Sequence, residues 1–226
     1  MPYRRVQFVF GLLLSSLGCF AQGASPGLAQ APALAEIQSL IRSRQYDQAL
    51  AITAADLKKE PADYRLWTMQ GIALSLKGDT AHAVASFDKA IHLSPAYIPA
   101  LKGEVQILFQ SNDQRAVPLL EKLIKADPHD AIAHEMLATL ERKNNDCAAA
   151  NQHFELAGDA INAHAESLEA YGYCLFETRQ PDKAISIFAQ LVSLLPDRAY
   201  PKYDLAVVQV AVKQYNATPS RRLNPF

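Results

Sequence analysis

The stretch that decides the fold runs from Gly78 to Pro95 and reads GDTAHAVASFDKAIHLSP. Within it, Ala83, Phe87 and Ala90 fall at i, i+4 and i+7, so two small residues and one ring share a single face of a helix. A face of small residues lets a neighbouring helix approach closely, and a ring fills the space that remains. The stretch therefore predicts a helix that packs tightly against other helices.

The same face recurs at a nearly fixed period along the chain. Five alanines are separated by 34, 33, 34 and 34 residues: Ala49, Ala83, Ala116, Ala150 and Ala184. A second series has the same separations: Gly71, Val105, Ala138, Gly172 and Ala206. Four prolines and one asparagine follow the alanines by 12 residues: Pro61, Pro95, Pro128, Asn162 and Pro196. The short intervals of the two series overlap only between Val105 and Ala116, so one residue is missing there, in the turn QSNDQR.

These residues resemble the tetratricopeptide repeat, whose pattern is a Trp, Leu-Gly, Tyr, an Ala with an aromatic four residues later, and a Pro. Residues 64–97 match it best, with Trp67, Gly71, Leu74, Ala83, Phe87, Ala90 and Pro95. Residues 165–198 follow with Leu168, Gly172, Leu175, Ala184, Phe188 and Pro196. The other repeats match less well. Residues 131–164 have His134 for the Trp and no proline, residues 98–130 are looser with Leu120 at the aromatic position, and the first repeat is degenerate with Thr53 there.

The resemblance implies an all-α, right-handed superhelical solenoid of antiparallel helix pairs. We assign five repeats, a half repeat and a tail: 34–63, 64–97, 98–130, 131–164, 165–198, 199–213 and 214–226. Each pair cannot bury its apolar face alone and stacks on the next pair. We therefore give a structural role to the residues that fill the repeat pattern: Trp67, Gly71, Ala83, Phe87, Ala90, Pro95, Ala116, Leu120, Pro128, Ala138, Ala150, Phe154, Gly172, Ala184, Phe188 and Pro196.

In this family the first helix of each pair lines a concave groove, and we expect a protein or peptide partner to bind there. In 165–178, the face that does not stack carries Glu169, Tyr173, Phe176 and Glu177. Aromatic rings flanked by carboxylates suit a peptide or helix partner, although Tyr173 and Phe176 could instead pack on the neighbouring pair. By resemblance, the groove also includes Arg65, Lys102, Phe109, Arg142, Lys143, Tyr200 and Tyr203.

The charges of these residues predict a groove that runs from basic to acidic and aromatic, which suits an oriented, extended ligand. Ordinary solvation of exposed helix faces is the alternative. The family's clamp for a free C-terminal carboxylate uses Lys and Asn at set positions. Here those positions hold Thr68, Ile72 and Gly103, so we do not expect binding of that kind.

Residues 1–23 have the layout of a secretory signal peptide, with Arg4 and Arg5 before an apolar stretch. That stretch reaches about 22 Å as a helix, short of the ~30 Å hydrocarbon core of a bilayer. With a linker at 24–33, we expect an exported protein of the periplasm or cell envelope. Cys19 in SLGC resembles a lipid-attachment box, so an outer-membrane lipoprotein subunit of an envelope assembly is the alternative, with membrane contact through the lipid.

No catalytic motif stands out, and we expect neither an enzyme nor a cofactor or metal site. The chain lacks a phosphate-binding loop, a nucleophile elbow, H-E-x-x-H and C-x-x-C. The nearest candidate is DPHDAIAH, where His129 and His134 could serve an enzyme or a metal ion, but Asp130 suits a helix cap and His134 fills the Trp position. A net charge of −1 gives no general field for nucleic acid.

Two further features leave alternatives open. Cys147 and Cys174 are most simply two buried, unpaired thiols, and in an oxidising compartment they could form a disulfide instead. In the half repeat at 199–213, LAVVQVAV is apolar nearly all round, whereas a terminal capping helix should have a polar outer face. We expect a partner, a second copy or the tail to cover this face, and a shortened gene product is the alternative.

Overall fold

The structure of the chain is a computed structural model that describes residues 31–217. The expected signal peptide, Cys19 and the end of the tail at 218–226 lie outside the described residues. Within the described range there are eleven α-helices, one 3₁₀ helix and no strand. They are α1 (Ala31–Arg42), α2 (Tyr46–Lys59), α3 (Tyr64–Lys77), α4 (Thr80–Leu93), α5 (Ile98–Gln110), α6 (Ala116–Ala126), α7 (Ala131–Lys143), α8 (Cys147–Ala157), η2 (Gly158–Ala163), α9 (Ala165–Glu177), α10 (Pro181–Leu194) and α11 (Ala199–Ala217).

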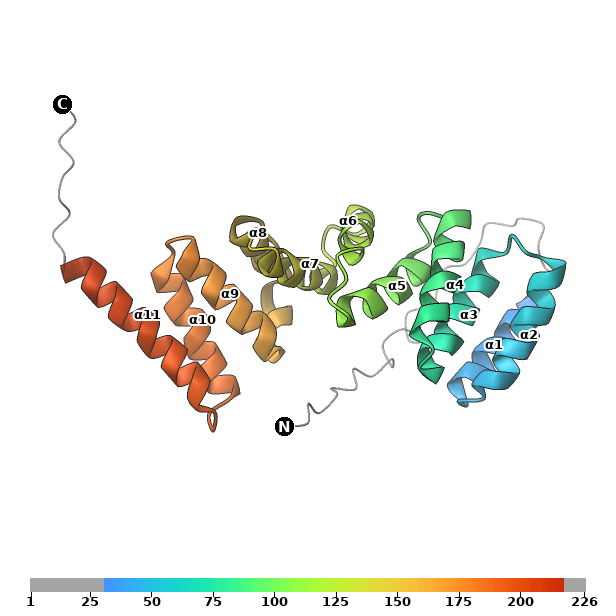
Figure 1. The fold of residues 1–226 in the computed structure, drawn as a ribbon, viewed down its shortest axis with the longest axis horizontal. Helices are drawn as coiled ribbons and strands as arrows, with labels where there is room; N and C mark the ends of the chain where they lie inside the picture. Colours follow the sequence, from blue (N-terminus) through green and yellow to red (C-terminus); the bar gives the residue numbers. More distant parts are fainter. Residues whose placement is uncertain (1–30, 218–226) are drawn as a thin grey trace, which may run out of the picture.

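The helices form antiparallel pairs that follow one another in sequence order, from α1 and α2 at one end to α11 at the other (Figure 1). This arrangement confirms the all-α solenoid. Odd-numbered helices contact their own partner and also each other, as α3 does with α1 and α5, and α7 does with α9. Even-numbered helices contact the odd-numbered helix of the next repeat but approach one another less closely than the odd-numbered helices do, so the odd-numbered helices form the inner layer. No helix among residues 31–217 is long and apolar enough to cross a membrane.

The ring of Phe87 joins two repeats by filling the space over two glycines. Phe87 is 0% exposed. A Cβ added to Gly71 of α3 would lie 2.8 Å from the ring, and one added to Gly103 of α5 would lie 2.4 Å from it. Phe188 lies in the same way over Gly172, 2.8 Å from an added Cβ. Backbone and ring are therefore in direct contact, which only glycine permits at these positions.

The repeat alanines and prolines divide into buried and exposed sets. The helix-packing alanines are completely buried: Ala49, Ala83, Ala90, Ala116, Ala138, Ala150 and Ala184. Leu120 and Phe154, which occupy the ring position of their repeats, are buried as well. The prolines lie exposed in the turns between repeats: Pro61, Pro95, Pro128 and Pro196. The contacts between helices thus depend on small side chains, whereas the prolines restrict the backbone conformation of the turns.

One residue in each turn between paired helices has a left-handed backbone conformation. These residues have φ between 55° and 94°: Arg44, Gly78, Asn112, Asn145 and Arg179. Each turn closes with the same backbone hydrogen bond across it, such as Asp79 N–H to Leu74 O at 2.9 Å. The interval from Asn112 to Asn145 is the short one, so the missing residue lies between Asn112 and Ala116.

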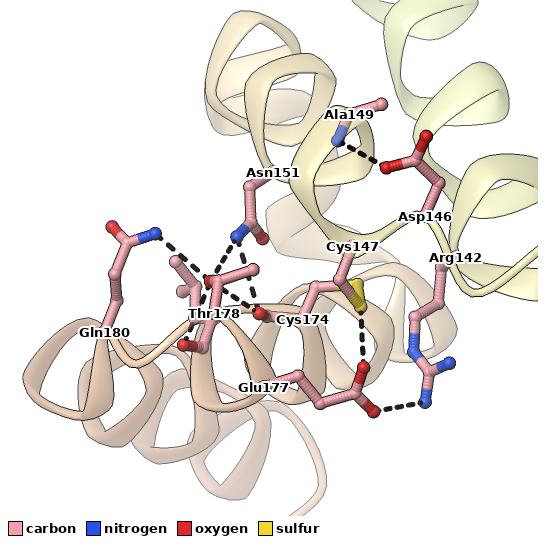
Figure 2. The surroundings of a disulfide bond; sticks show 10 residues. Arg142, Asp146, Cys147, Ala149, Asn151, Cys174, Glu177, Thr178 and Gln180 are labelled. Atoms are coloured by element: carbon pink, nitrogen blue, oxygen red, sulfur yellow. Dashed lines mark hydrogen bonds and ion pairs between the residues drawn. A yellow bond between two sulfur atoms is a disulfide. The ribbon is translucent and has the colours of Figure 1, made fainter.

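Cys147 at the start of α8 and Cys174 in α9 form a disulfide, with their Cα atoms 4.7 Å apart (Figure 2). Our simpler interpretation, two unpaired thiols, is therefore wrong. Both residues are buried as expected, at 6% and 0% exposed. Burial alone does not separate the two interpretations, because pairing depends on how closely α8 and α9 approach. The bond links the fourth repeat to the fifth.

Candidate functional site

The candidate site is the inner face of the odd-numbered helices, and its predicted basic residues all contact acidic groups of the same chain. Arg65 Nη2 lies 2.7 Å from Asp63, whose carboxylate also caps α3. Lys102 Nζ lies 2.8 Å from Asp130, the cap of α7. The pKa of Asp130 is lowered because hydrogen bonds from Lys102 and the helix N-terminus outweigh its burial.

Two further pairs connect the fourth repeat to its neighbours. Arg142 lies 3.5 Å from Glu177, whose other carboxylate oxygen is 3.1 Å from Cys147 Sγ (Figure 2). Lys143 lies 3.5 Å from Glu166 and also contacts the side chain of Asn112. The predicted gradient from basic to acidic thus has no free basic end, because its four cations already pair with acidic groups of the chain.

The predicted aromatic residues of the groove divide into packed and exposed ones. Phe109 and Phe176 are partly buried and pack against the apolar core. Tyr173 makes an edge contact with Phe188, at 5.3 Å between ring centroids, and its hydroxyl donates to Asp204 Oδ1 at 2.8 Å. Tyr200 and Tyr203 are 41% and 70% exposed. Only the last two therefore offer large areas of ring to a partner.

The junction of α9 and α11 concentrates negative charge. Asp204 is 8% exposed, and its Oδ2 has no hydrogen-bond partner. Burial, and then the charges of Asp204 and Glu166, raise the pKa of Glu169. Burial and the hydrogen bond to Asp204 raise the pKa of Tyr173 to about 12. We name Glu169, Tyr173, Tyr200 and Asp204 the acidic cluster.

Helix α11 has one covered stripe and one exposed stripe. Pro201, Asp204 and Val208 are buried, and α11 contacts α10. The exposed stripe consists of four large apolar side chains at i, i+3, i+7 and i+10: Tyr200, Tyr203, Val207 and Val210. Within the described residues, α10 thus covers only part of the apolar surface that the sequence places on 199–213.

The positions of the family's carboxylate clamp have packing roles here. Thr68 is fully buried and donates to Tyr64 O at 2.8 Å. Ile72 is partly buried against the core. Gly103 lies under the ring of Phe87. These three positions therefore serve the packing of the repeats.

His134 acts as a structural substitute for the tryptophan of the repeat. Its Nε2 lies 3.1 Å from Pro128 O, and Trp67 Nε1 donates to Pro61 O at 2.8 Å, six residues back in both cases. His134 is 2% exposed, and its Nδ1 lies 2.9 Å from Nδ1 of His153. Among residues 31–217, no group of three or more His, Cys, Asp or Glu side chains could hold a metal ion.

Sequence reasoning missed two polar residues that connect repeats. Asp204 receives the hydrogen bond of Tyr173, as described above. Glu135 of α7 accepts hydrogen bonds from His164 Nδ1 at 2.6 Å and from Ser167 Oγ at 2.5 Å. Both are acidic residues in helix stretches that are otherwise largely apolar, and each contacts a residue about one repeat away. A search for such residues at that distance could have found both.

Two family models match the chain. One is described as the cytochrome c-type biogenesis protein H TPR domain and matches residues 45–168. The other is described as a tetratricopeptide repeat and matches residues 136–204. The first alone spans more than half of the chain. No curated protein matched the chain.

Solved structures with the same fold include MamA and YrrB. A MamA RS-1 double mutant is 22% identical, with 76% of this chain and 97% of that chain covered and a TM-score of 0.64. MamA from residue 41 to the end, from Desulfovibrio magneticus RS-1, is 22% identical, with 77% and 99% covered and a TM-score of 0.63. YrrB, described as a TPR protein with an unusual peptide-binding site, is 15% identical, with 81% and 91% covered and a TM-score of 0.65. At these identities the likeness shows the fold alone.

Proposed function

Because the chain belongs to the tetratricopeptide repeat family, we propose that it is an exported scaffold that binds a protein or peptide on its inner face, without catalysis. The observation that carries the proposal is the exposed stripe of α11, Tyr200 to Val210, beside the acidic cluster. Contiguous apolar side chains at a polar edge are typical of binding surfaces. Aromatic residues are also enriched where partners bind tightly.

The rest of the inner face supports a binding position near α9 and α11 rather than along the whole groove. Arg65, Lys102, Arg142 and Lys143 already contact acidic groups of the chain. A partner that used these cations would first have to break those pairs. The exposed stripe requires no such exchange, so most of the affinity should come from the C-terminal end.

Export is the second part of the proposal. The disulfide between Cys147 and Cys174 supports it, because disulfides persist in oxidising compartments and are rare in the cytosol. The signal-like sequence of residues 1–23 agrees with this location. Lipid attachment at Cys19 would place the scaffold on the outer membrane. The mass of the mature N-terminal peptide decides between a free protein and a lipoprotein.

The binding proposal can be tested with two matched variants. Tyr203→Ala/Val207→Ser removes exposed apolar surface from α11, and Leu156→Ala removes a 58% exposed side chain from α8, outside the inner layer. Partners are cross-linked in the native envelope, purified and titrated against each variant. We expect the affinity to fall at least about tenfold for the α11 variant and to stay unchanged for Leu156→Ala. Equal affinities for the two variants would contradict the proposal.

Self-association through 199–213 is a distinct outcome of the same experiment. If the recovered partner is a second copy of this chain, sedimentation should show an oligomer that the α11 variant converts to monomer. If the chain is monomeric and still recovers a different protein, the exposed stripe serves that protein. Retention of full oligomerisation by the α11 variant would place the contact elsewhere.

A further inference from the structure

The acidic cluster brings two carboxylates and two phenols together from two helices. Glu169 and Tyr173 come from α9, and Tyr200 and Asp204 come from α11. Asp204 links the helices because its Oδ1 accepts from the Tyr173 hydroxyl at 2.8 Å. Its Oδ2 is buried and has no partner. An unpaired carboxylate oxygen in such a place is costly unless a donor or a cation reaches it.

Two cations lie near the acidic cluster without pairing with its carboxylates. Arg142 lies close enough to lower the pKa of Tyr173, but it pairs with Glu177. Arg198 likewise acts to lower the pKa of Tyr200, and its own side chain is exposed. Glu166, which adds negative charge near Glu169, contacts Lys143. Among residues 31–217, neither Glu169 nor Asp204 forms an ion pair or a hydrogen bond with a cationic side chain.

The titration of the surrounding groups agrees with an excess of negative charge. The pKa of Tyr200 is raised by burial and by the charge of Glu169, with a smaller contribution from Asp204. Glu169 and Tyr173 shift in the same direction, with Asp204 among the causes for both. Burial is the largest cause of all three shifts, and the charge of Asp204 adds to each of them.

We propose that the acidic cluster is a subsite for an arginine side chain of the segment that binds the inner face, an inference that rests on the proposed function. A planar guanidinium can donate to Glu169, which is partly exposed, and to Asp204 Oδ2 once the side chains that cover this oxygen move. It also stacks favourably on tyrosine rings, which Tyr200 and Tyr203 supply at the edge of the cluster. The expected ligand is thus a segment with an arginine beside apolar residues that lie on Val207 and Val210.

The position of Asp204 in its repeat supports a role in binding rather than in packing. It is the sixth residue of the half repeat that begins at Ala199, and Gly103 is the sixth residue of the repeat that begins at Ile98. Gly103 meets the ring of the preceding repeat. Asp204 places a carboxylate at the same position, where the stack ends within the described residues. A residue that only closed the stack would not need a charge there.

The subsite can be tested with two short peptides and the full chain. The probe is the acetylated, amidated pentapeptide Ala-Leu-Arg-Leu-Ala, and its control carries citrulline, which is neutral and of the same shape. Binding is followed by NMR up to about 10 mM peptide, a range that detects millimolar dissociation constants. We expect the arginine peptide to bind at least about tenfold more tightly than the citrulline peptide and to shift signals of Tyr173, Tyr200 and Tyr203.

Conservative variants assign this preference to the two carboxylates. Asp204→Asn keeps the acceptor for Tyr173, and Glu169→Gln keeps the shape, so both should fold. Each should weaken the arginine peptide about fivefold, and the double variant should bind both peptides equally. Asp182→Asn, an exposed acid of α10, is the matched control and should change nothing. Equal binding of the two peptides to the wild type, or an arginine preference that survives in the double variant, would overturn the proposal.

Failure of the subsite differs from failure of the proposed function. If the arginine preference is absent while Tyr203→Ala/Val207→Ser still weakens the native partner, the subsite is wrong and the scaffold function stands. If the arginine preference is present but the native partner ignores both the α11 variant and the double variant, the proposed function is wrong.

Discussion

Two junctions between repeats use the same position of the fold in opposite ways. Between α3 and α5, the ring of Phe87 lies over Gly71 and Gly103, and every group is apolar and buried. Between α9 and α11, Phe188 lies over Gly172, but Asp204 occupies the position equivalent to Gly103 and has an unpartnered oxygen. Glu104, which follows Gly103, also has a buried oxygen without a partner, but it does not occupy the position next to the ring. We propose that Asp204, at that position in the second junction, serves binding.

The largest expected effect is at the apolar junction. Phe87→Ala removes a fully buried ring and leaves a cavity between two repeats, which should lower the free energy of unfolding by about 3–5 kcal/mol. Urea unfolding monitored by circular dichroism measures this change. Leu156→Ala, an exposed apolar residue, serves as the control and should stay within about 0.5 kcal/mol of the wild type. A loss below about 1 kcal/mol for Phe87→Ala would show that the ring does not hold the repeats together.

The C-terminal half has a covalent link in addition to its packing. Replacing Cys147 and Cys174 by alanine opens a loop of 27 residues and should cost about 2–4 kcal/mol. A reducing agent should lower the stability of the wild type by a similar amount and leave the double variant unchanged. If reduction has no effect on the stability of the wild type, the disulfide does not stabilise the C-terminal repeats.

An intermediate effect is expected at the glycine that receives the ring. Gly103→Ala places a Cβ 2.4 Å from Phe87, so the ring or the helix must move, at a cost of about 1–3 kcal/mol. The added helix propensity of alanine offsets part of this cost. The double variant Gly103→Ala/Phe87→Leu should recover part of the loss relative to the sum of the single changes. Simple additivity would show that the two residues do not touch in solution.

A smaller effect concerns Glu104, a buried carboxylate that follows Gly103. Burial, and then the charge of Asp88, raise the pKa of Glu104 to about 7. The folded chain therefore holds a proton that the unfolded chain releases near pH 4.5, so stability falls as the pH rises from about 4.5 to about 7 and is constant above. Glu104→Gln should reduce the difference in unfolding free energy between pH 5 and pH 8 by about 1–2 kcal/mol. An unchanged difference would contradict this assignment.

The period of the sequence was enough to predict the solenoid, because each repeat must place small residues and a ring at fixed positions. The site was less predictable. Arg142 and Lys143 looked free because their partners, Glu177 and Glu166, lie more than twenty residues away and in the next repeat. The disulfide likewise depends on a distance between helices that no local pattern contains.

The sequence alone could have marked Asp204 as an unusual residue for its position in the repeat. The repeat register assigns it the position of Gly103, and a carboxylate in that position conflicts with the packing role of the register. Such a conflict between local residue and global fold is itself a signal of function. The unusual carboxylate could have pointed to Asp204 as the hydrogen-bond partner of Tyr173. That Asp204 Oδ2 has no partner could be learned only from the structure.

The most direct test of the account is urea unfolding of the wild type and Asp204→Asn, each with and without the arginine pentapeptide. If Asp204 gives up stability in order to bind a cation, the variant alone should be more stable by about 1 kcal/mol, because an unpaired buried charge is removed. The peptide should then stabilise the wild type and have much less effect on the variant. A variant that is less stable than the wild type, and that the peptide stabilises equally, would contradict the account.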